Sequence, residues 1–240
     1  AYCREVDDAV DEPSDPGVAA GKLAWWRTET ARLYAGDPQH PVTRALQPFV
    51  EPLAIHREHL EAIMDGMEMD LTQSRYLDYA NLKLYCHRVA GVVGLLAAGI
   101  FGYTNPRTLE YAARLGLAFQ LTNIIRDVGE DARNNRIYLP MDELRRFNVT
   151  AADILNARPG ENFSRLMAHQ AQRAHACYDE AMALLPPEDR RAQRPGLVMA
   201  AIYRTVLEEI GRDGYPVLTQ RISLTPLRKL WIAWRTWMKA

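Results

Sequence analysis

The chain has 240 residues, a formal net charge of −1, 48% hydrophobic residues and 25% charged residues. This composition is that of an ordinary globular protein and excludes a disordered or strongly basic chain. Because there is no basic excess, nucleic acid is not an expected partner. The three cysteines form no CxxC pair, and the first residues show no signal-peptide pattern. We therefore expect reduced thiols and a cytoplasmic location.

Apolar residues recur at spacings of three and four along almost the whole chain, which predicts helices rather than strands. Proline and glycine separate these helical patterns. No repeat of fixed period and no low-complexity linker divides the chain, so we expect residues 1–240 to form one all-α domain. The predicted helices span residues 2–12, 17–34, 41–64, 73–101, 106–132, 140–147, 150–155, 160–184, 188–211 and 223–239.

A first acidic patch lies in the sequence YCREVDDAVDE at residues 2–12. On a helix, Arg4, Asp7, Asp8 and Asp11 fall within an arc of about 100°. Carboxylates this close repel each other, and Mg²⁺ is a natural counter-charge because it prefers oxygen ligands shared with phosphates. Arg4 could then hold a diphosphate. The alternative is a solvated acidic face on which Arg4 pairs with Asp8.

A second acidic patch extends over about three turns of the helix predicted at 106–132. Gln120, Asn123, Asp127 and Asp131 form one polar stripe between apolar flanks, which indicates that the stripe faces a buried cavity. Asn123 and Asp127 are candidate metal ligands, with Asp131 as a further one. Gln120 and Arg126 are candidate diphosphate contacts. The alternative is a buried polar network that keeps helices in register.

The first patch lies within a few residues of the start of the chain. Chain ends fray, and functional motifs seldom lie there. We therefore expect that an additional N-terminal helix precedes this sequence in the natural protein.

Three segments resemble the squalene/phytoene synthase family of head-to-head prenyl transferases. They are YCREVDDAVDE at 2–12, YCHRVAGVVG at 85–94 and LGLAFQLTNIIRDVGEDARNNRIYLP at 115–140. Within this family, the branch most similar to the chain is the bacterial presqualene diphosphate synthases of hopanoid biosynthesis, with the phytoene synthases as close neighbours. This similarity to the hopanoid branch rests on residues 12–29, 40–46, 65–71 and 214–235.

The resemblance implies a class I terpenoid synthase-like helical bundle around a central cavity. It also implies two or three Mg²⁺ ions that bridge a diphosphate. The metal ligands it implies are Asp7, Asp11, Asn123, Asp127 and Asp131. NADPH is not expected, since the chain has no G-x-G-x-x-G motif.

The resemblance also assigns residues to the substrate. The implied substrate contacts are Arg4, Gln120, Asn123, Arg126, Tyr203 and Arg221. The implied catalytic residues are Tyr85, near the reacting carbons, together with Arg4, Asp8 and Arg126.

The implied reaction joins two molecules of farnesyl diphosphate into presqualene diphosphate and releases diphosphate. A second possibility is the condensation of two geranylgeranyl diphosphates to phytoene. A third is a non-catalytic assembly factor with the same fold. Such relatives tend to lose the acidic motifs, and both motifs are present here, which favours an enzyme.

The longest uncharged run extends from Val89 to Tyr103. It is shorter than the ~20 residues that a membrane-spanning helix needs, so we predict a buried, glycine-rich core helix. Its small residues could leave room for isoprenoid tails, or they could serve close helix packing. The small residues are Gly91, Gly94, Ala97, Ala98 and Gly99.

The last predicted helix has an apolar face beside a basic one. The apolar face holds Leu227, Leu230, Trp231, Trp234 and Met238, and the basic face holds Arg228, Arg235 and Lys239. This pattern suits peripheral contact with the inner face of a membrane, and it equally suits a helix that packs on the core.

Overall fold

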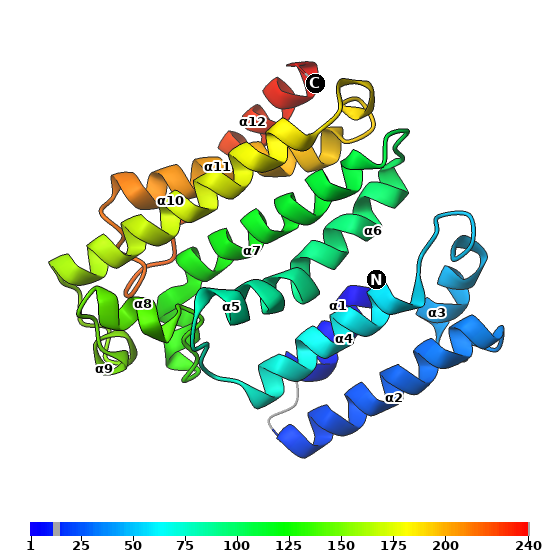
Figure 1. Cartoon of the computed structure of the whole chain (residues 1–240), viewed down its shortest axis with the longest axis horizontal. Coiled ribbons are helices and arrows are strands. Elements are labelled where there is room, and N and C mark those ends of the chain that lie inside the picture. The colour runs from blue at the N-terminus through cyan, green and yellow to red at the C-terminus, as the bar shows by residue number, and fades with distance from the viewer. Residues whose placement is uncertain (12–14, 240) are drawn as a thin grey trace.

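The computed structural model describes residues 1–11 and 15–239, and helices make up most of them (Figure 1). The α-helices are α1 (Tyr2–Asp11), α2 (Pro16–Ala35), α3 (Pro41–Leu46), α4 (Arg57–Thr72), α5 (Tyr79–Cys86), α6 (Val92–Phe101), α7 (Arg107–Arg133), α8 (Met141–Arg146), α9 (Ala151–Leu155), α10 (Glu161–Leu184), α11 (Arg194–Arg212) and α12 (Pro226–Lys239). A π-helical turn, His87–Gly91, joins α5 to α6, and short 3₁₀ turns span Gln47–Phe49 and Pro187–Asp189. The prediction of an all-α fold is confirmed.

The described hydrophobic core has two parts. One part lies among α1, α2 and α4, and the other surrounds α7 and extends to α12. Val89, in the π-helical turn, packs against both. Figure 1 shows α2 and α4 along one side of the molecule, with α10, α11 and α12 on the other side and α7 between them.

Helix α7 packs against α6, α10 and α11. Hydrogen bonds to one buried carboxylate hold the start of this helix in place. The carboxylate of Asp189 accepts hydrogen bonds from the amides of Thr104 and Asn105 and from the hydroxyls of Thr104 and Thr108. Burial of Asp189 would raise its pKa, but these hydrogen bonds outweigh it and lower the pKa to about 2. The loop before α7 is therefore tied to the 3₁₀ turn that follows α10.

Close packing through small residues is confirmed between α6 and α7. A Cβ atom on Gly94 would overlap the carbonyl oxygen of Ala112, and one on Gly116 would overlap that of Ala90. The same helices also leave an apolar cavity of about 220 Å³, lined by Val93, Ala97 and other residues of α6, α7 and α11.

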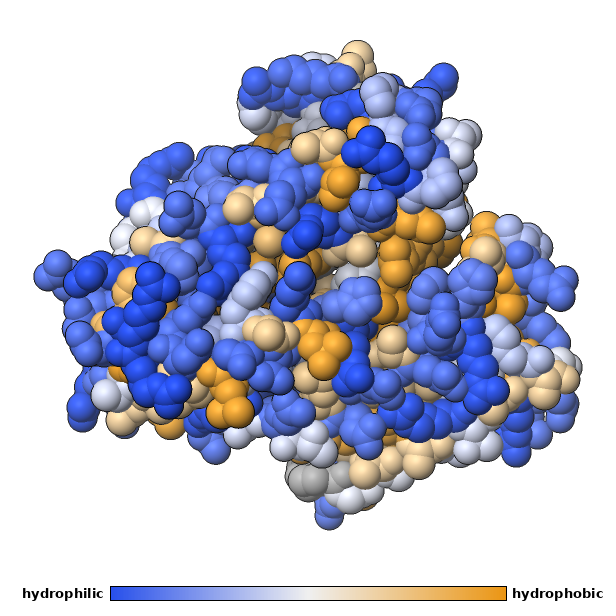
Figure 2. Space-filling view, viewed as in Figure 1, coloured by the Kyte–Doolittle hydropathy of each residue, from blue (hydrophilic) through white to orange (hydrophobic). Residues whose placement is uncertain are grey.

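The prediction of a buried, glycine-rich core helix within 89–103 is confirmed only in part. Within α6 only Val92 and Ala98 are buried, and Val93, Ala97 and Phe101 line the cavity, which forms a hollow open to the surface. Figure 2 shows apolar side chains gathered in this hollow beside α6, on a face that is otherwise polar. By length and composition, the stretch Tyr79–Phe101 could cross a membrane. Its packing against α4 and α7 explains its apolar composition without a membrane.

Two long predicted helices are interrupted. The helix predicted at 41–64 ends in a 3₁₀ turn, and a new helix begins at Arg57, since Pro48 and Pro52 cannot donate backbone hydrogen bonds. The helix predicted at 73–101 starts only at Tyr79. Residues 74–77 instead run beside 137–142, with backbone bonds such as Ile137 to Ser74. Asp78 caps the new helix by accepting from the amide of Asn81.

The last two helices also begin later than predicted, α11 at Arg194 and α12 at Pro226. The alternative of a core-packing C-terminal helix is confirmed in part, because α12 packs along α11 and contributes Ile232, the one buried residue among those described in α12, to the core.

Candidate active site

The second acidic patch lies on a partly buried face of α7. Gln120, Asn123, Asp127 and Asp131 are each half-buried, while Leu121, Ile124, Ile125 and Val128 around them are buried. The Asn123 amide nitrogen donates weakly to Gln120, at 3.4 Å. Its Oδ1 atom is buried and has no partner. A buried oxygen without a donor is costly and is ready to accept a ligand.

Two guanidinium groups hold Asp127. Arg126 donates to it at 2.8 Å and Arg221 at 2.9 Å. Hydrogen bonding to Asp127 raises the pKa of Arg126, to which the neighbouring Tyr203 also contributes. Tyr203 comes from α11 and Arg221 from the segment after it, so the fold brings together four residues that the sequence proposed for one site.

The segment that carries Arg221 is docked directly on α7. The amide of Gly129 donates to the carbonyl of Val217 at 3.0 Å, and a Cβ atom on Gly129 would overlap the carbonyls of Val217 and Leu218. Only glycine permits this approach.

Asp131 lies one turn beyond Asp127. Burial, followed by the charges of Asp127, Glu130 and Asp70, raises its pKa to about 7, although Arg136 opposes the shift. A carboxylate in such surroundings gains strongly from a nearby cation.

Sequence reasoning missed a cluster of tyrosines around Asp70, at the end of α4. The carboxylate of Asp70 accepts from Tyr85 at 2.8 Å and from Tyr138 at 2.7 Å. The ring of Tyr138 stacks on those of Tyr76 and Tyr85, with centroids 5.8 and 5.3 Å apart, and the rings of Tyr76 and Tyr85 are tilted against each other at 5.4 Å. Tyr85 is thus buried, and burial first, then the charge of Asp70, raises its pKa.

Arg136 connects this cluster to the acidic stripe. It donates to the backbone carbonyl of Asp70 at 3.1 Å and acts electrostatically on Asp131. The signals in the sequence were the acidic segment DGMEMDL at 65–71 and the residues RIYLP that follow α7.

The first acidic patch lies on α1, which packs on α2 and α4. Arg4 pairs with Asp8 at 2.8 Å within the helix, and the Arg4 side chain is 76% exposed. The expected alternative of an intrahelical pair is therefore present. Asp7 is half-buried, and the side chain of Asp11 lies outside the described part of the structure.

The placement of the two patches on facing walls of one site remains a prediction. Helices α1 and α7 belong to different parts of the core, and α4 connects them. Helix α4 packs on α1, and its Asp70 contacts the residues that follow α7.

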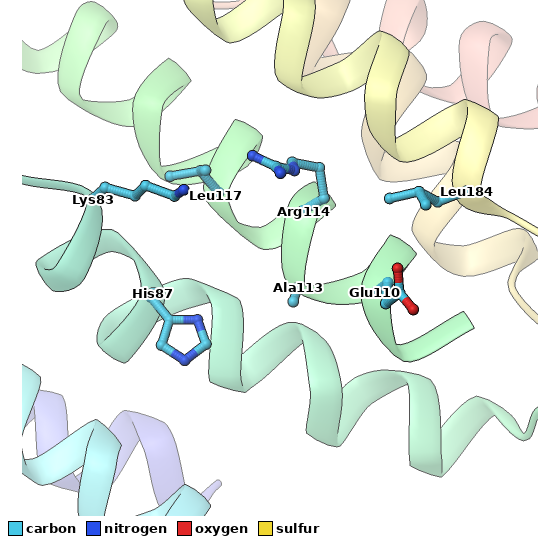
Figure 3. Close-up of a pocket in the computed structure, with 7 residues that line it drawn as sticks. All are labelled: Lys83, His87, Glu110, Ala113, Arg114, Leu117 and Leu184. Atoms are coloured by element: carbon cyan, nitrogen blue, oxygen red, sulfur yellow. The ribbon is translucent and has the colours of Figure 1, made fainter. Parts of the chain in front are cut away.

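A polar pocket of about 290 Å³ opens elsewhere, between α5, α7 and α10. Figure 3 shows Lys83 and His87 on one side of it and Arg114 and Glu110 on α7. Arg114 pairs with Glu180 at 3.2 Å. None of the residues that the sequence proposed for the active site lines this pocket, so we do not include it in the site.

Known proteins resemble this chain in sequence and fold. Residues 1–228 match the family model described as squalene/phytoene synthase. The chain belongs to the squalene/phytoene synthase family. Members of this family are prenyltransferases of isoprenoid biosynthesis.

Individual members match along most of the chain. The phytoene synthase of Arthrospira platensis is 37% identical over 245 aligned residues, which cover 95% of this chain and 78% of that protein. A chloroplastic phytoene synthase of an Oncidium hybrid cultivar is 33% identical, and the match covers 95% of this chain and 57% of that protein. The chain thus spans little more than half of this plant relative.

Solved structures of the squalene/phytoene synthase family agree. A squalene synthase of Alicyclobacillus acidocaldarius superposes with a TM-score of 0.79 at 29% identity, covering 89% of this chain and 81% of that one. A dehydrosqualene synthase crystallised with a ligand superposes with a TM-score of 0.84 at 26% identity, covering 99% and 83%. The expected isoprenoid synthase-like helical bundle is confirmed.

Proposed function

We propose that this protein joins two prenyl diphosphates head to head and releases diphosphate. The observation that carries the proposal is the cluster of Asn123, Arg126, Asp127 and Arg221, which combines oxygen ligands with guanidinium groups at one place on α7. Such a cluster suits a diphosphate with divalent cations. Family membership supports the same reaction class.

The residues present fit Mg²⁺. The unpartnered Oδ1 of Asn123 and the crowded carboxyl of Asp131 would both be satisfied by a divalent cation. Among the described residues, no group of three His, Cys, Asp or Glu side chains could hold a metal ion. Diphosphate oxygens would therefore complete the ligand set that Asn123, Asp127 and Asp131 begin, with Asp7 and Asp11 as the ligands from α1. Bound ions would neutralise charge on the departing diphosphate.

The arginines would exchange partners when substrate binds. Asp127 pairs with both Arg126 and Arg221 in the free protein, and Glu130 lies 3.6 Å from Arg221. A diphosphate carries more negative charge than a carboxylate and would replace Asp127 as their partner. We expect Tyr203 and Gln120 to add hydrogen bonds, and Arg4 to contact the second diphosphate.

With its diphosphate held, the donor ionises to an allylic cation, which the double bond of the second substrate attacks. Loss of a proton then closes a cyclopropane, and the departing diphosphate accepts that proton. The ring of Tyr85 lies in the stacked tyrosine cluster beside Asp70, and aromatic faces stabilise cations. The apolar cavity between α6 and α7 would hold an isoprenoid tail and exclude water.

For the substrate we propose farnesyl diphosphate, with presqualene diphosphate as product. The likeness of four segments to the hopanoid branch supports it, as do the solved neighbours named squalene synthase and dehydrosqualene synthase. Geranylgeranyl diphosphate is the second candidate, because the curated relatives at 32–37% identity are named phytoene synthases.

Mass spectrometry of the product tests the proposal. The full-length protein is incubated with Mg²⁺ and either farnesyl or geranylgeranyl diphosphate, and released diphosphate is measured in parallel. A C30 diphosphate from the farnesyl substrate is the expected result. Formation of phytoene from the geranylgeranyl substrate would instead identify geranylgeranyl diphosphate, the second candidate, as the substrate. Absence of diphosphate release from either substrate would point to a non-catalytic assembly factor.

Substitution of Asp127 by asparagine tests the site itself. We expect at least a hundredfold loss of diphosphate release, because a metal ligand and the partner of two arginines are both weakened. Exposed Asp37→Asn on the α2–α3 connection is the matched control. Full activity of Asp127→Asn would refute the assignment.

A further inference from the structure

Helix α12 presents its apolar side to solvent. Of its described residues only Ile232 is buried, and Ala233 and Thr236 beside it are half-buried. Large apolar side chains occupy the opposite side and are mostly more than half exposed. They are Leu227 at 80%, Leu230 at 66%, Trp231 at 54%, Trp234 at 64%, Trp237 at 49% and Met238 at 68%. At 100° per residue they span an arc of about 120°. This is the reverse of a helix that packs on a core.

A basic pocket lies along the flank of this apolar face. It has a volume of about 440 Å³ between α11 and α12, and its lining includes Arg190, Arg204, Arg235 and Lys239 but no acidic residue. Arg204 is paired with Asp179 at 2.8 Å. The other three basic side chains form no ion pair among the described residues. Trp231 lines the pocket as well, and the Arg235 guanidinium lies 5.2 Å from its ring.

We propose that α12 docks on a bilayer that contains anionic phospholipid. The tryptophans, leucines and methionine enter the interfacial region, and a headgroup phosphate binds in the basic pocket. Indole rings favour the headgroup level of a membrane, and basic residues near the surface favour anionic lipid. The apolar face and the basic pocket share Trp231, so one lipid molecule can contact both.

Charge favours an anionic bilayer over a second copy of the chain as the partner of α12. The sequence of α12, PLRKLWIAWRTWMK, has four basic residues and no acidic one. A two-fold contact through α12 would place two such helices against each other, and like charges would oppose it. An anionic bilayer offers an apolar layer and negative charge together.

The docking surface is distinct from the proposed active site. Helix α12 lies along α11 at the edge of the molecule opposite α2 (Figure 1). The residues that would contact lipid are not those assigned to diphosphate binding. Variants of α12 should therefore leave diphosphate release in detergent unchanged, and the docking can fail without the proposed function failing.

Vesicle flotation of the full-length protein tests the proposal. One vesicle preparation contains phosphatidylcholine alone, and the other has phosphatidylglycerol as a third of its lipid. We expect binding only to the anionic vesicles, with weaker binding at high salt. Trp231→Ser/Trp234→Ser should lower binding about tenfold, because less apolar surface enters the bilayer. Arg235→Glu/Lys239→Glu should lower binding at least as much, because the attraction to anionic lipid is lost.

Two control variants match these changes elsewhere on the surface. Arg145→Glu/Arg146→Glu on α8 changes the net charge equally, and Leu77→Ser removes a side chain that is 72% exposed. Both should bind vesicles like the unaltered protein, and circular dichroism confirms that every variant is folded.

Three results would overturn the proposal. The first is equal binding to neutral and anionic vesicles, and the second is unchanged binding of both α12 variants. The third is found without lipid: if the tryptophans of α12 are shielded from acrylamide quenching in the full-length protein, then protein covers the helix instead. Comparison with the Trp231→Ser/Trp234→Ser variant shows how much of the protein's fluorescence comes from these two tryptophans.

Discussion

The carboxyl of Asp131 shows how single residues in this site depend on charge. Burial and its acidic neighbours raise its pKa to about 7, whereas an aspartate in the unfolded chain has a pKa near 4. The folded state therefore binds more protons than the unfolded state between these values. The resulting stabilisation is complete below about pH 4 and is lost as the pH rises through about 7.

Asp131→Asn should accordingly stabilise the metal-free protein in alkaline solution. In EDTA at pH 8 we expect its free energy of unfolding to exceed that of the unaltered protein by roughly 1–3 kcal/mol, and the difference should vanish near pH 4. Urea unfolding at several pH values measures it. Exposed Asp37→Asn is the control. The same gain at pH 4 and pH 8 would show that charge is not the cause.

The hydroxyl and the ring of Tyr85 can be tested separately. Tyr85→Phe keeps the stacked ring but removes a 2.8 Å hydrogen bond to Asp70, which still receives one from Tyr138. We expect a loss of about 1 kcal/mol in stability and at least a tenfold fall in turnover. Tyr138→Phe removes the other donor and is the matched comparison. Unchanged turnover in Tyr85→Phe would limit this residue to packing.

At the scale of elements, the contact between α7 and the segment 217–221 controls where Arg221 lies. The overlap of a Cβ atom on Gly129 with two carbonyls makes this contact sensitive to one methyl group. Helix boundaries in this protein likewise depend on local chemistry. The cap at Asp78 starts α5 later than apolar periodicity alone predicted, and the prolines between α3 and α4 end a helix that this periodicity extended.

Gly129→Ala should therefore displace Arg221 and weaken its contribution to the site. We expect about 1–3 kcal/mol of destabilisation from overpacking, together with weaker binding of inorganic diphosphate. Isothermal titration and thermal unfolding measure the two effects. Gly21→Ala on α2 is the control, since nothing lies within 4 Å of its added carbon. If the Gly129→Ala protein is destabilised but its diphosphate affinity is unaltered, then Arg221 does not contribute to diphosphate binding.

At the scale of the whole molecule, three helices and the π-helical turn line the apolar cavity of about 220 Å³. Its walls come mainly from α6, α7 and α11, and close glycine contacts hold α6 against α7. The cavity is therefore a property of helix packing. Substrate length should respond to side-chain volume in its wall.

Ala97→Phe should shorten the isoprenoid that the enzyme accepts, because a phenyl ring takes up about 100 Å³ of the available space. Competition between geranyl, farnesyl and geranylgeranyl diphosphates, with products identified by mass spectrometry, measures the preference. Ile100→Phe, at an exposed position of the same helix, is the control. An unchanged preference in Ala97→Phe would place the tails elsewhere.

The all-α class, the family and the polar stripe on α7 could be predicted from the sequence, because helical periodicity and the oxygen ligands of a motif are properties of short segments. The family resemblance also placed Tyr203 and Arg221 in the same site. Only the tertiary structure revealed the pairing of Asp70 with two tyrosines, the partial exposure of α6 and the outward apolar side of α12. These depend on which distant segments meet, and burial and pKa follow from those neighbours rather than from local sequence.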